Sequence, residues 1–98
     1  MNRLSISRQA RQDLKDIFVY VARDKPEAAK RLRLALGRVF RTLARNPLMG
    51  EARPDLGRDV RVFSFGSYGV FFRAGGGGVA IARVLHGARD VTGPWFPG

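Results

Sequence analysis

The spacing of apolar residues changes between residues 45 and 60, and this change constrains the fold of the chain more than any other feature. Before it, apolar residues recur at intervals of three and four, the period of an amphipathic helix. After it, three runs are rich in β-branched and aromatic residues, at 60–65 (VRVFSF), 68–74 (YGVFFRA) and 79–85 (VAIARVL). Helices followed by strands predict an α+β fold.

The N-terminal part predicts a strand and then a helix. Leu4 and Ile6 alternate with polar neighbours, which indicates a short edge strand over about residues 2–6. Ser7 then stands where a helix N-cap is favoured. On a helical wheel of roughly 100° per residue, one face of this helix comprises Ala10, Leu14, Ile17, Phe18 and Val21. Val19 lies outside that face.

A second helix is predicted over residues 26–45. Pro26 fits a first helical turn, and Asp24 with Glu27 has the spacing of a capping box. The short connection predicts an antiparallel helical hairpin. The apolar face of the second helix comprises Ala29, Leu32, Ala35, Leu36, Val39, Phe40 and Leu43. The opposite face is an arginine stripe of Arg31, Arg38, Arg41 and Arg45, and Leu34 lies within it.

The charge of the chain and the arginine stripe each have two interpretations. Eighteen Lys and Arg residues against eight Asp and Glu residues give a net charge of +10. Such an imbalance favours binding to nucleic acid or to an acidic protein, whereas abundant arginine also follows from genomic base composition. The stripe is either a solvated helix surface or a docking face for an acidic partner, to which Val19 and Leu34 would add apolar contacts.

The last third of the sequence predicts a three-stranded antiparallel meander. Its runs are separated by Gly66 and Ser67 and by four glycines at 75–78, which are short connections. The glycine run leads into a strand and not a helix, so it predicts a hairpin turn and not a phosphate-binding loop. A loop over residues 46–57 precedes the meander. We expect this loop to be pinned to the core by Leu48, Met49 and Leu56.

Together these elements predict one α+β domain over residues 1–98, with a core to about residue 91 and a tail over residues 92–98. An N-terminal strand, an antiparallel helical hairpin and the three-stranded meander follow one another, and the hairpin covers one face of the sheet. No apolar run approaches the roughly 20 residues of a membrane span. Because the N-terminus also lacks the apolar region of a secretory signal, we expect a cytoplasmic protein with no membrane partner.

The residue types exclude several kinds of chemistry. The chain has no cysteine and one histidine, so disulfides and thiolate metal sites are excluded, and we expect neither a metal nor another cofactor. The serines lie on a strand, at a cap or beside a hairpin turn, which are poor contexts for a nucleophile. Asp13 and Asp16 are expected to be exposed on the first helix. No hydrolase signature remains.

Metal-free cleavage of RNA stays open, because arginine and histidine can hold a phosphate and move a proton. Strand alternation places Arg61 with Phe63 and Phe65, and Arg83 with Val79, Ile81 and Leu85. A charge on an apolar face often marks a functional site. The candidate basic patch comprises Arg61, Arg83, His86 and Arg89. In the alternative interpretation Arg83 pairs with an acid at the sheet margin, such as Asp90 or Asp59.

Four segments resemble, in order and spacing, the ParE branch of the RelE/ParE toxins of bacterial type II toxin–antitoxin systems. They are ISRQARQDLKDIFVYVARDKPEAAKRL, LARNPLMGEARPDLG, VRVFSFGSYGVFFR and ARVLHGARDV, which together cover about residues 4–91. The resemblance implies the fold already predicted from periodicity. It also implies an acidic ParD-like antitoxin that wraps the toxin in a hetero-oligomeric complex, and DNA gyrase as the target.

Relatives in the same superfamily are ribosome-dependent mRNA nucleases, which is the alternative function. Nuclease members place a tyrosine or histidine with basic residues near the chain end. Here no tyrosine follows Tyr68, so the resemblance favours gyrase inhibition, with no catalytic residues and no sequence-specific binding of nucleic acid. A third alternative is an antitoxin-binding module that has lost toxicity. Trp95 and Phe96, in the unusual tail TGPWFPG, either fold back onto the core or present an aromatic contact to a partner.

Overall fold

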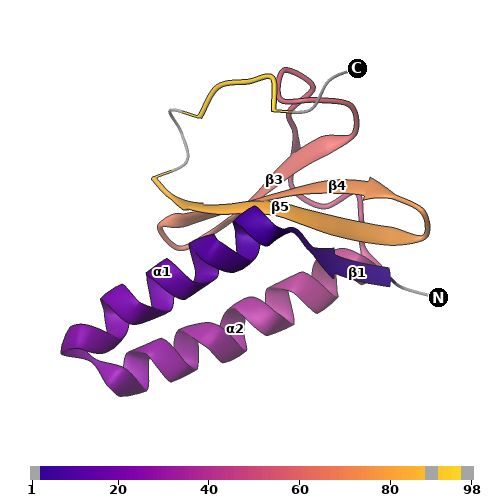
Figure 1. Cartoon of the computed structure of the whole chain (residues 1–98). Coiled ribbons are helices and arrows are strands. Elements are labelled where there is room, and N and C mark those ends of the chain that lie inside the picture. The colour runs from indigo at the N-terminus through magenta and orange to yellow at the C-terminus, as the bar shows by residue number, and fades with distance from the viewer. Residues whose placement is uncertain (1–2, 88–90, 96–98) are drawn as a thin grey trace.

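The computed structural model describes residues 3–87 and 91–95 and confirms the predicted α+β class. Figure 1 shows both helices on one side of the sheet and residues 91–95 on the other side. The elements in chain order are β1 (Arg3–Ile6), α1 (Arg8–Asp24), α2 (Pro26–Arg45), β2 (Glu51–Ala52), β3 (Val60–Phe65), β4 (Tyr68–Gly75) and β5 (Gly78–His86).

The five strands form one mixed sheet in the order β1-β5-β4-β3-β2. The predicted antiparallel meander is confirmed, because β3 pairs with β4 and β4 with β5 in antiparallel fashion. The N-terminal strand lies at the edge as predicted, and it runs parallel to β5 with Leu4 opposite Val79. The short strand β2 was not predicted, and it pairs with β3 through Glu51 and Ala52.

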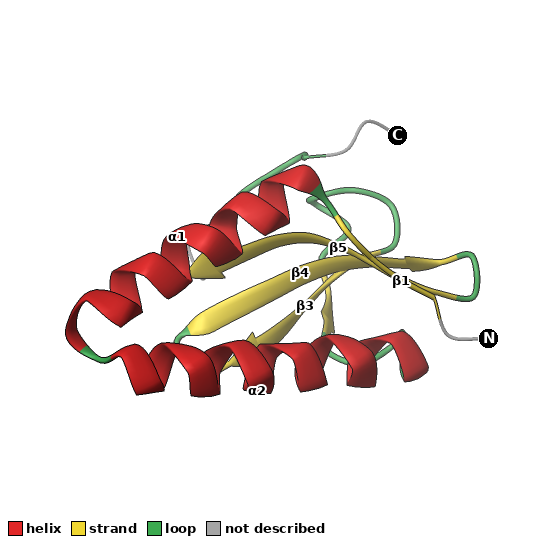
Figure 2. Ribbon diagram, turned by 60° about the horizontal axis from the view of Figure 1, so that its bottom comes forward, coloured by secondary structure: helices red, strands yellow, loops and turns green. Residues whose placement is uncertain are grey.

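The main core lies between the helical hairpin and the sheet. The buried side chains come from both helices and from β4 and β5: Ala10, Leu36, Phe40, Leu43, Ala44, Val70, Phe72, Val79, Ile81 and Val84. Figure 2 shows α1 running along the β5 side of the sheet and α2 along the β3 side. The apolar faces predicted from helical periodicity therefore point at the sheet, and their burial is the main stabilising term of the fold.

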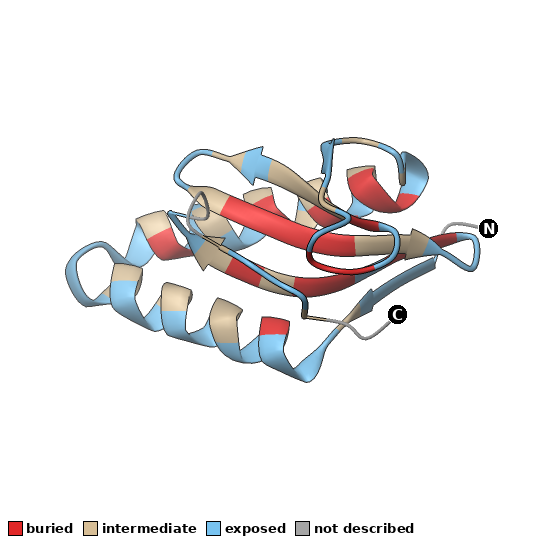
Figure 3. Ribbon diagram, turned by 90° about the horizontal axis from the view of Figure 1, so that it is seen from above, coloured by how far each residue is buried: buried red, intermediate tan, exposed pale blue. Residues whose placement is uncertain are grey.

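A second, smaller core covers the opposite face of the sheet. Leu56, Val60 and Phe71 are buried there, and Trp95 packs against them. The loop that contains Leu56 and the tail lie across this face (Figure 3). Leu56 therefore pins its loop as expected, whereas Leu48 is exposed. Trp95 folds back onto the core, which confirms that alternative for this residue; Phe96 lies outside the described residues.

The capping predictions have opposite outcomes. Ser7 caps α1 as predicted: its hydroxyl accepts a hydrogen bond from the Ala10 N–H at 2.9 Å and donates one to the Ala82 carbonyl at 2.8 Å. The capping box of Asp24 and Glu27 was wrong, because α1 continues through Asp24 and Lys25 alone separates the two helices. Pro26 occupies the first turn of α2, as its missing N–H favours.

An irregularity in β5 changes the expected alternation of its side chains. Phe71 pairs with Arg83 and Phe72 with Ile81, so Ala82 is an extra residue in β5. Val79 and Ile81 therefore face the helices, whereas Leu85 joins the opposite core. The prediction that Arg83 shares a face with Val79 and Ile81 was wrong, because strict alternation does not survive a bulge.

Among the helices in the described residues, none is long and apolar enough to cross a membrane.

Candidate functional site

An apolar groove runs between α1 and α2 on the outer surface of the helical hairpin. It has a volume of about 590 Å³ and is lined by Phe18, Val19, Ala22, Pro26, Ala29, Lys30, Arg33 and Leu34; we call it the hairpin groove. Val19 is 49% exposed and Leu34 62% exposed, although both are large apolar residues. The sequence singled out these two residues as external contacts on different helices, and the structure places them in one groove.

The arginine stripe forms the ridge beside this groove. Arg31, Arg38, Arg41 and Arg45 are all exposed on α2. Because 31, 38 and 45 are seven residues apart, these three side chains follow one line along the helix. Arg33, on the groove side, lies 5.4 Å from the centre of the Phe18 ring in a cation–π contact. The hairpin groove therefore has apolar walls and a strongly basic border.

A second apolar groove lies on the other side of the arginine ridge, between α2 and β3. Its walls come from α2, the following loop and β3: Ala35, Arg38, Val39, Thr42, Leu43, Met49, Phe63 and Phe65, which we call the edge groove. Its volume is about 310 Å³. Arg38 thus stands between the two grooves and borders the second.

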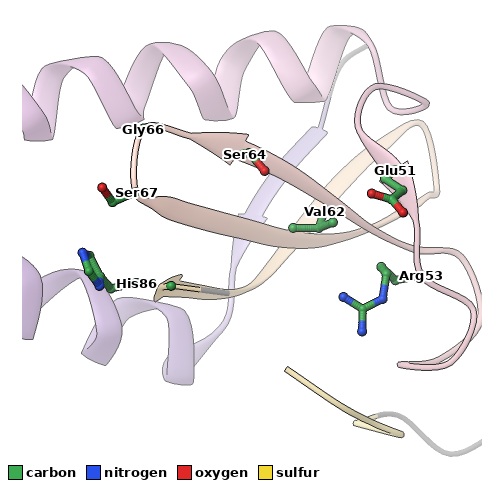
Figure 4. Close-up of a pocket in the computed structure, with 8 residues that line it drawn as sticks. Glu51, Arg53, Val62, Ser64, Gly66, Ser67 and His86 are labelled. Atoms are coloured by element: carbon green, nitrogen blue, oxygen red, sulfur yellow. The ribbon is translucent and has the colours of Figure 1, made fainter. Parts of the chain in front are cut away.

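A polar pocket of about 730 Å³ opens on the opposite face of the sheet. Figure 4 shows its lining, which includes Glu51 and Arg53 at one end and Ser67 and His86 at the other, with Ser64 between them. The polar groups in this lining are two hydroxyls, a carboxylate, a guanidinium and an imidazole, so the pocket is neither strongly basic nor strongly acidic. The pocket can hydrogen-bond a polar ligand but has no cluster of cations for a phosphate.

The structure does not assemble the predicted basic patch around His86. The Arg61 guanidinium donates hydrogen bonds to the Met49 and Gly50 carbonyls, at 3.0 Å each, and so fixes the loop before β2. Neither Arg61 nor Arg83 is among the residues that line the polar pocket with His86. Arg89 lies outside the described residues.

Arg83 is held by α1. Its guanidinium donates to both carboxylate oxygens of Asp13, at 2.8 and 3.0 Å, and the Val84 N–H donates to the same carboxylate at 3.0 Å. The Asp13 hydrogen bonds raise the pKa of Arg83, so it stays charged at any physiological pH. The prediction that Arg83 pairs with an acid is therefore confirmed, but the acid is Asp13 and not Asp59. Asp90, the other predicted partner, lies outside the described residues. Asp13 was expected to be exposed, and its side chain is only 11% exposed.

Tyr68 lies directly opposite His86 on the neighbouring strand. Their ring centres are 5.4 Å apart, with an angle of 76° between the ring planes. No tyrosine follows His86 in the sequence, but strand pairing supplies a phenol beside it. Sequence order alone could not reveal this neighbour.

The tail is attached to the loop at Arg53. This arginine forms a two-point pair with Asp55, at 2.8 and 2.9 Å, and donates a further hydrogen bond to the Val91 carbonyl at 2.8 Å. The hydrogen bonds from Arg53 lower the pKa of the Asp55 carboxyl below its ordinary value. The backbone N–H of Trp95 donates to the Leu56 carbonyl at 2.8 Å, and the indole ring meets the Phe71 ring edge-on, with ring centres 4.8 Å apart. Trp95 is therefore a packed side chain.

A family model described as the ParE toxin of the type II toxin–antitoxin system parDE matches residues 4–91 of the chain. The chain belongs to this family. Its fold is similar to a solved chain titled "Chromosomal ParDE TA system from P. aeruginosa", with a TM-score of 0.73 and 24% identity over 88% of this chain and 96% of that one. No curated protein matches the sequence.

The two apolar grooves and the ridge between them lie on the helix side of the sheet. The sequence identified the ridge, Val19 and Leu34, but not the edge groove. The alternation of apolar and polar residues in this strand predicts Phe63 and Phe65 as ordinary core residues. Both are half-buried against the main core and line the edge groove, which no local pattern signals.

Proposed function

We propose that this ParE-family chain is a cytoplasmic toxin that inhibits DNA gyrase and is neutralised by an acidic antitoxin. Membership of the family, over residues 4–91, supports the toxin role. The segments NPLMG, FGSY and VLHGARD resemble the ParE branch and support gyrase as the target.

The observation that carries the antitoxin partner is the hairpin groove beside the arginine ridge. An amphipathic helix that places apolar residues in the groove and carboxylates over Arg31 and Arg38 would satisfy both features. Charge attraction would also speed association, given the net charge of +10. The antitoxin is therefore expected to present an acidic helix with one apolar face, in a hetero-oligomeric complex.

A supercoiling assay tests the target. Purified protein should block ATP-dependent supercoiling by gyrase and should lose this effect when the protein encoded by the adjacent reading frame is added. Normal supercoiling at saturating toxin, with the protein folded, would refute gyrase inhibition.

Substitutions test the docking surface. Leu34→Asp and Val19→Asp should each weaken binding of that adjacent-frame protein by about 10-fold or more, because each places a charge in an apolar contact. Leu48→Asp is the matched control, since Leu48 is also a large apolar residue, more exposed than Leu34, but lies outside the hairpin groove. Equal affinity of Leu34→Asp and Leu48→Asp would remove the groove from the interface.

The contact between Tyr68 and His86 favours a second candidate function, cleavage of ribosome-bound mRNA. A phenol and an imidazole with ring centres 5.4 Å apart can stack a base and move a proton. Cleavage of mRNA on purified ribosomes that disappears in His86→Ala and in Tyr68→Phe would support this function. Gyrase inhibition that survives both substitutions would exclude it as the cause of toxicity.

A further inference from the structure

Arg3 and Arg73 lie on the outer face of the sheet, at the end far from His86. Arg73 is two residues beyond Phe71, which packs in the smaller core, so alternation directs both side chains to that face. Arg3 is three residues before Ile6, which packs against the main core, so it too faces outward. Both arginines flank the first residues of β5, whereas His86 ends that strand.

A shallow depression of about 790 Å³ is lined by both of these arginines. β1 and the turn between β4 and β5, which border it, are exposed (Figure 3). Among the described residues of its lining there is no aromatic side chain, and Leu4 is the one exposed large apolar residue. A partner can therefore approach the backbone of the sheet closely here. The base of the depression consists of small residues: Ser5, Ala74, Gly75, Gly76 and Ala80.

Gly78 allows β1, and with it Arg3, to reach this position. The Arg3 backbone N–H donates to the Gly77 carbonyl at 3.1 Å. A Cβ at residue 78 would collide with the Arg3 backbone. The glycine run therefore serves the close approach of β1 as well as the turn.

Two further arginines lie at the start of α1, beside the end of β1. Arg8 is the first residue of the helix, and the Arg11 Nε donates to the Ile6 carbonyl at 3.3 Å. Both are exposed, and the first turn of α1 contains no acidic residue. The helix dipole disfavours cations at this end, so helix stability does not explain their presence. A local conflict of this kind favours a role in binding. We call the four arginines the β1 corner: Arg3, Arg8, Arg11 and Arg73.

The β1 corner keeps most of its positive charge. In the part of the chain that the structure describes, Arg73 aside, none of its arginines forms an ion pair. The Arg73 Nε donates to the Arg58 carbonyl at 3.1 Å, which brings a fifth arginine to the same end of the sheet. Asp59 follows Arg58 and offsets one of these charges.

We infer that the β1 corner binds the phosphate backbone of duplex DNA. β1 is four residues long and β4 lies two strands away, so these arginines span an area roughly 10 Å on each side. Duplex DNA carries one charge per roughly 1.7 Å of its axis, so several phosphates meet this area. Arginine pairs with phosphate through two parallel hydrogen bonds. The choice of DNA rests on the proposed function, because gyrase acts on duplex DNA, but a direct contact with that DNA goes beyond it.

An acidic protein is the competing partner of a basic surface. Protein interfaces depend on buried aromatic and apolar anchors, and this surface offers Leu4 alone at its margin. Single-stranded nucleic acid depends on aromatic side chains on which its bases stack. Contacts to a duplex backbone need only spaced cations and a close approach. The chemistry of the β1 corner therefore favours the duplex.

Fluorescence anisotropy of the intact toxin with a labelled duplex of mixed sequence, in the absence of gyrase, tests the inference. Arg3→Gln combined with Arg11→Gln should weaken binding about 10-fold at low salt. The slope of the logarithm of the binding constant against the logarithm of salt concentration should fall by about 2, because each lost phosphate contact removes about 0.9. Arg3→Lys combined with Arg11→Lys keeps both charges and should retain the slope of the unmodified toxin.

Arg23→Gln combined with Arg31→Gln is the matched control. It removes the same charge from two exposed arginines beside the connection between the helices, at the end of the hairpin opposite β1 (Figure 1). Screening is strong beyond about 10 Å, so this variant should bind the duplex within about threefold of the unmodified toxin. All substitutions alter exposed side chains, and thermal unfolding should show the same midpoint for every variant.

The outcomes separate this inference from the proposed function. Equal losses of affinity in the two glutamine variants would assign DNA binding to net charge and overturn the inference, as would no binding by the unmodified toxin. A β1-corner variant that binds the duplex normally but no longer binds gyrase would assign the surface to the enzyme's polypeptide and also overturn it. Gyrase inhibition without DNA binding would leave the proposed function in place. DNA binding at the β1 corner with no effect on supercoiling would support the inference and refute gyrase inhibition.

Discussion

Asp13 on α1 accepts two hydrogen bonds from Arg83 on β5, although the two residues are 70 positions apart in the sequence. The same carboxylate accepts the Val84 N–H, on the stretch of β5 that extends beyond β1. Asp13 therefore occupies the sheet edge that β1 leaves open at this end. The helix therefore blocks this edge from pairing with another strand.

Asp13→Ala should destabilise the protein by about 2 kcal/mol, because it leaves the Val84 N–H and a half-buried guanidinium without their acceptor. Chemical denaturation followed by circular dichroism measures the free energy of unfolding. Asp16→Ala is the control on the same helix: Asp16 accepts only an exposed hydrogen bond from Gln12, and its loss should cost less than about 0.5 kcal/mol. Equal costs for the two variants would contradict the structural role of Asp13.

Gly50→Ala should destabilise the protein more than Gly66→Ala. Both glycines have a positive φ, 80° and 59°, so alanine carries the same left-handed backbone cost of about 1 kcal/mol at each. A Cβ at Gly50 would also collide with the Val62 carbonyl oxygen, whereas a Cβ at Gly66 meets nothing within 4 Å. The difference between the two unfolding free energies isolates the close approach of the loop to β3. Equal unfolding free energies for the two variants would contradict this prediction and would mean that the loop moves to accommodate the Cβ.

Trp95→Ala should cost about 2 kcal/mol, because it uncovers Phe71 and Leu56 on the outer face of the sheet. The measurement is the free energy of unfolding from circular dichroism, since Trp95 is the sole tryptophan and its fluorescence is lost. Trp95→Phe should recover part of that stability by keeping an aromatic ring against Phe71. If Trp95→Ala instead leaves stability unchanged and weakens partner binding, the residue serves the interface.

Acid should loosen the attachment of the tail. The pKa of Asp55 is lowered in the folded protein, so its pair with Arg53 contributes fully above the ordinary carboxyl pKa and is lost as pH falls through the lowered value. Trp95 fluorescence should therefore stay constant above about pH 4 and shift to the red at lower pH. Asp55→Asn should show an already weakened attachment at pH 7 and a smaller shift in acid. An identical acid transition in both proteins would assign the shift to other carboxyl groups.

His86→Ala should leave growth inhibition and stability nearly unchanged, within about 0.5 kcal/mol for stability, because the ring is exposed and contacts only the edge of Tyr68 in the described residues. Growth curves under induced expression and a denaturation profile measure the two quantities. Loss of toxicity with an unchanged profile and unchanged partner binding would make the histidine a participant in chemistry.

The periodicity of the sequence was sufficient to predict both helices, the meander and the edge position of the first strand, because each depends on a local pattern of burial. Periodicity could not predict the parallel pairing of β1 with β5, because Leu4 and Ile6 alternate with polar residues whichever strand lies beside them. The bulge at Ala82 was also invisible, because a continuous apolar run hides a change of face. One such residue was enough to direct Arg83 away from Ile81.

The candidate site was predicted in part, for a similar reason. Val19 and Leu34 stood out because each breaks the polar pattern of its own helix, which is a local signal. The edge groove has no such signal, because Phe63 and Phe65 alternate as core residues do and are half-buried against the core while they line the groove. The pairing of Tyr68 with His86 required strand register, which is a long-range property.

The parallel pairing of β1 with β5 also sets an order of events during protein synthesis. β1 and the N-terminus of α1 leave the ribosome well before their partners in the sheet, from Gly78 to Val84. A nascent chain therefore cannot close the sheet until its final strand has been translated. A reading frame interrupted before that strand yields a product in which neither β1 nor Asp13 has its partner on β5, so the toxin fold is acquired only after β5 has been made.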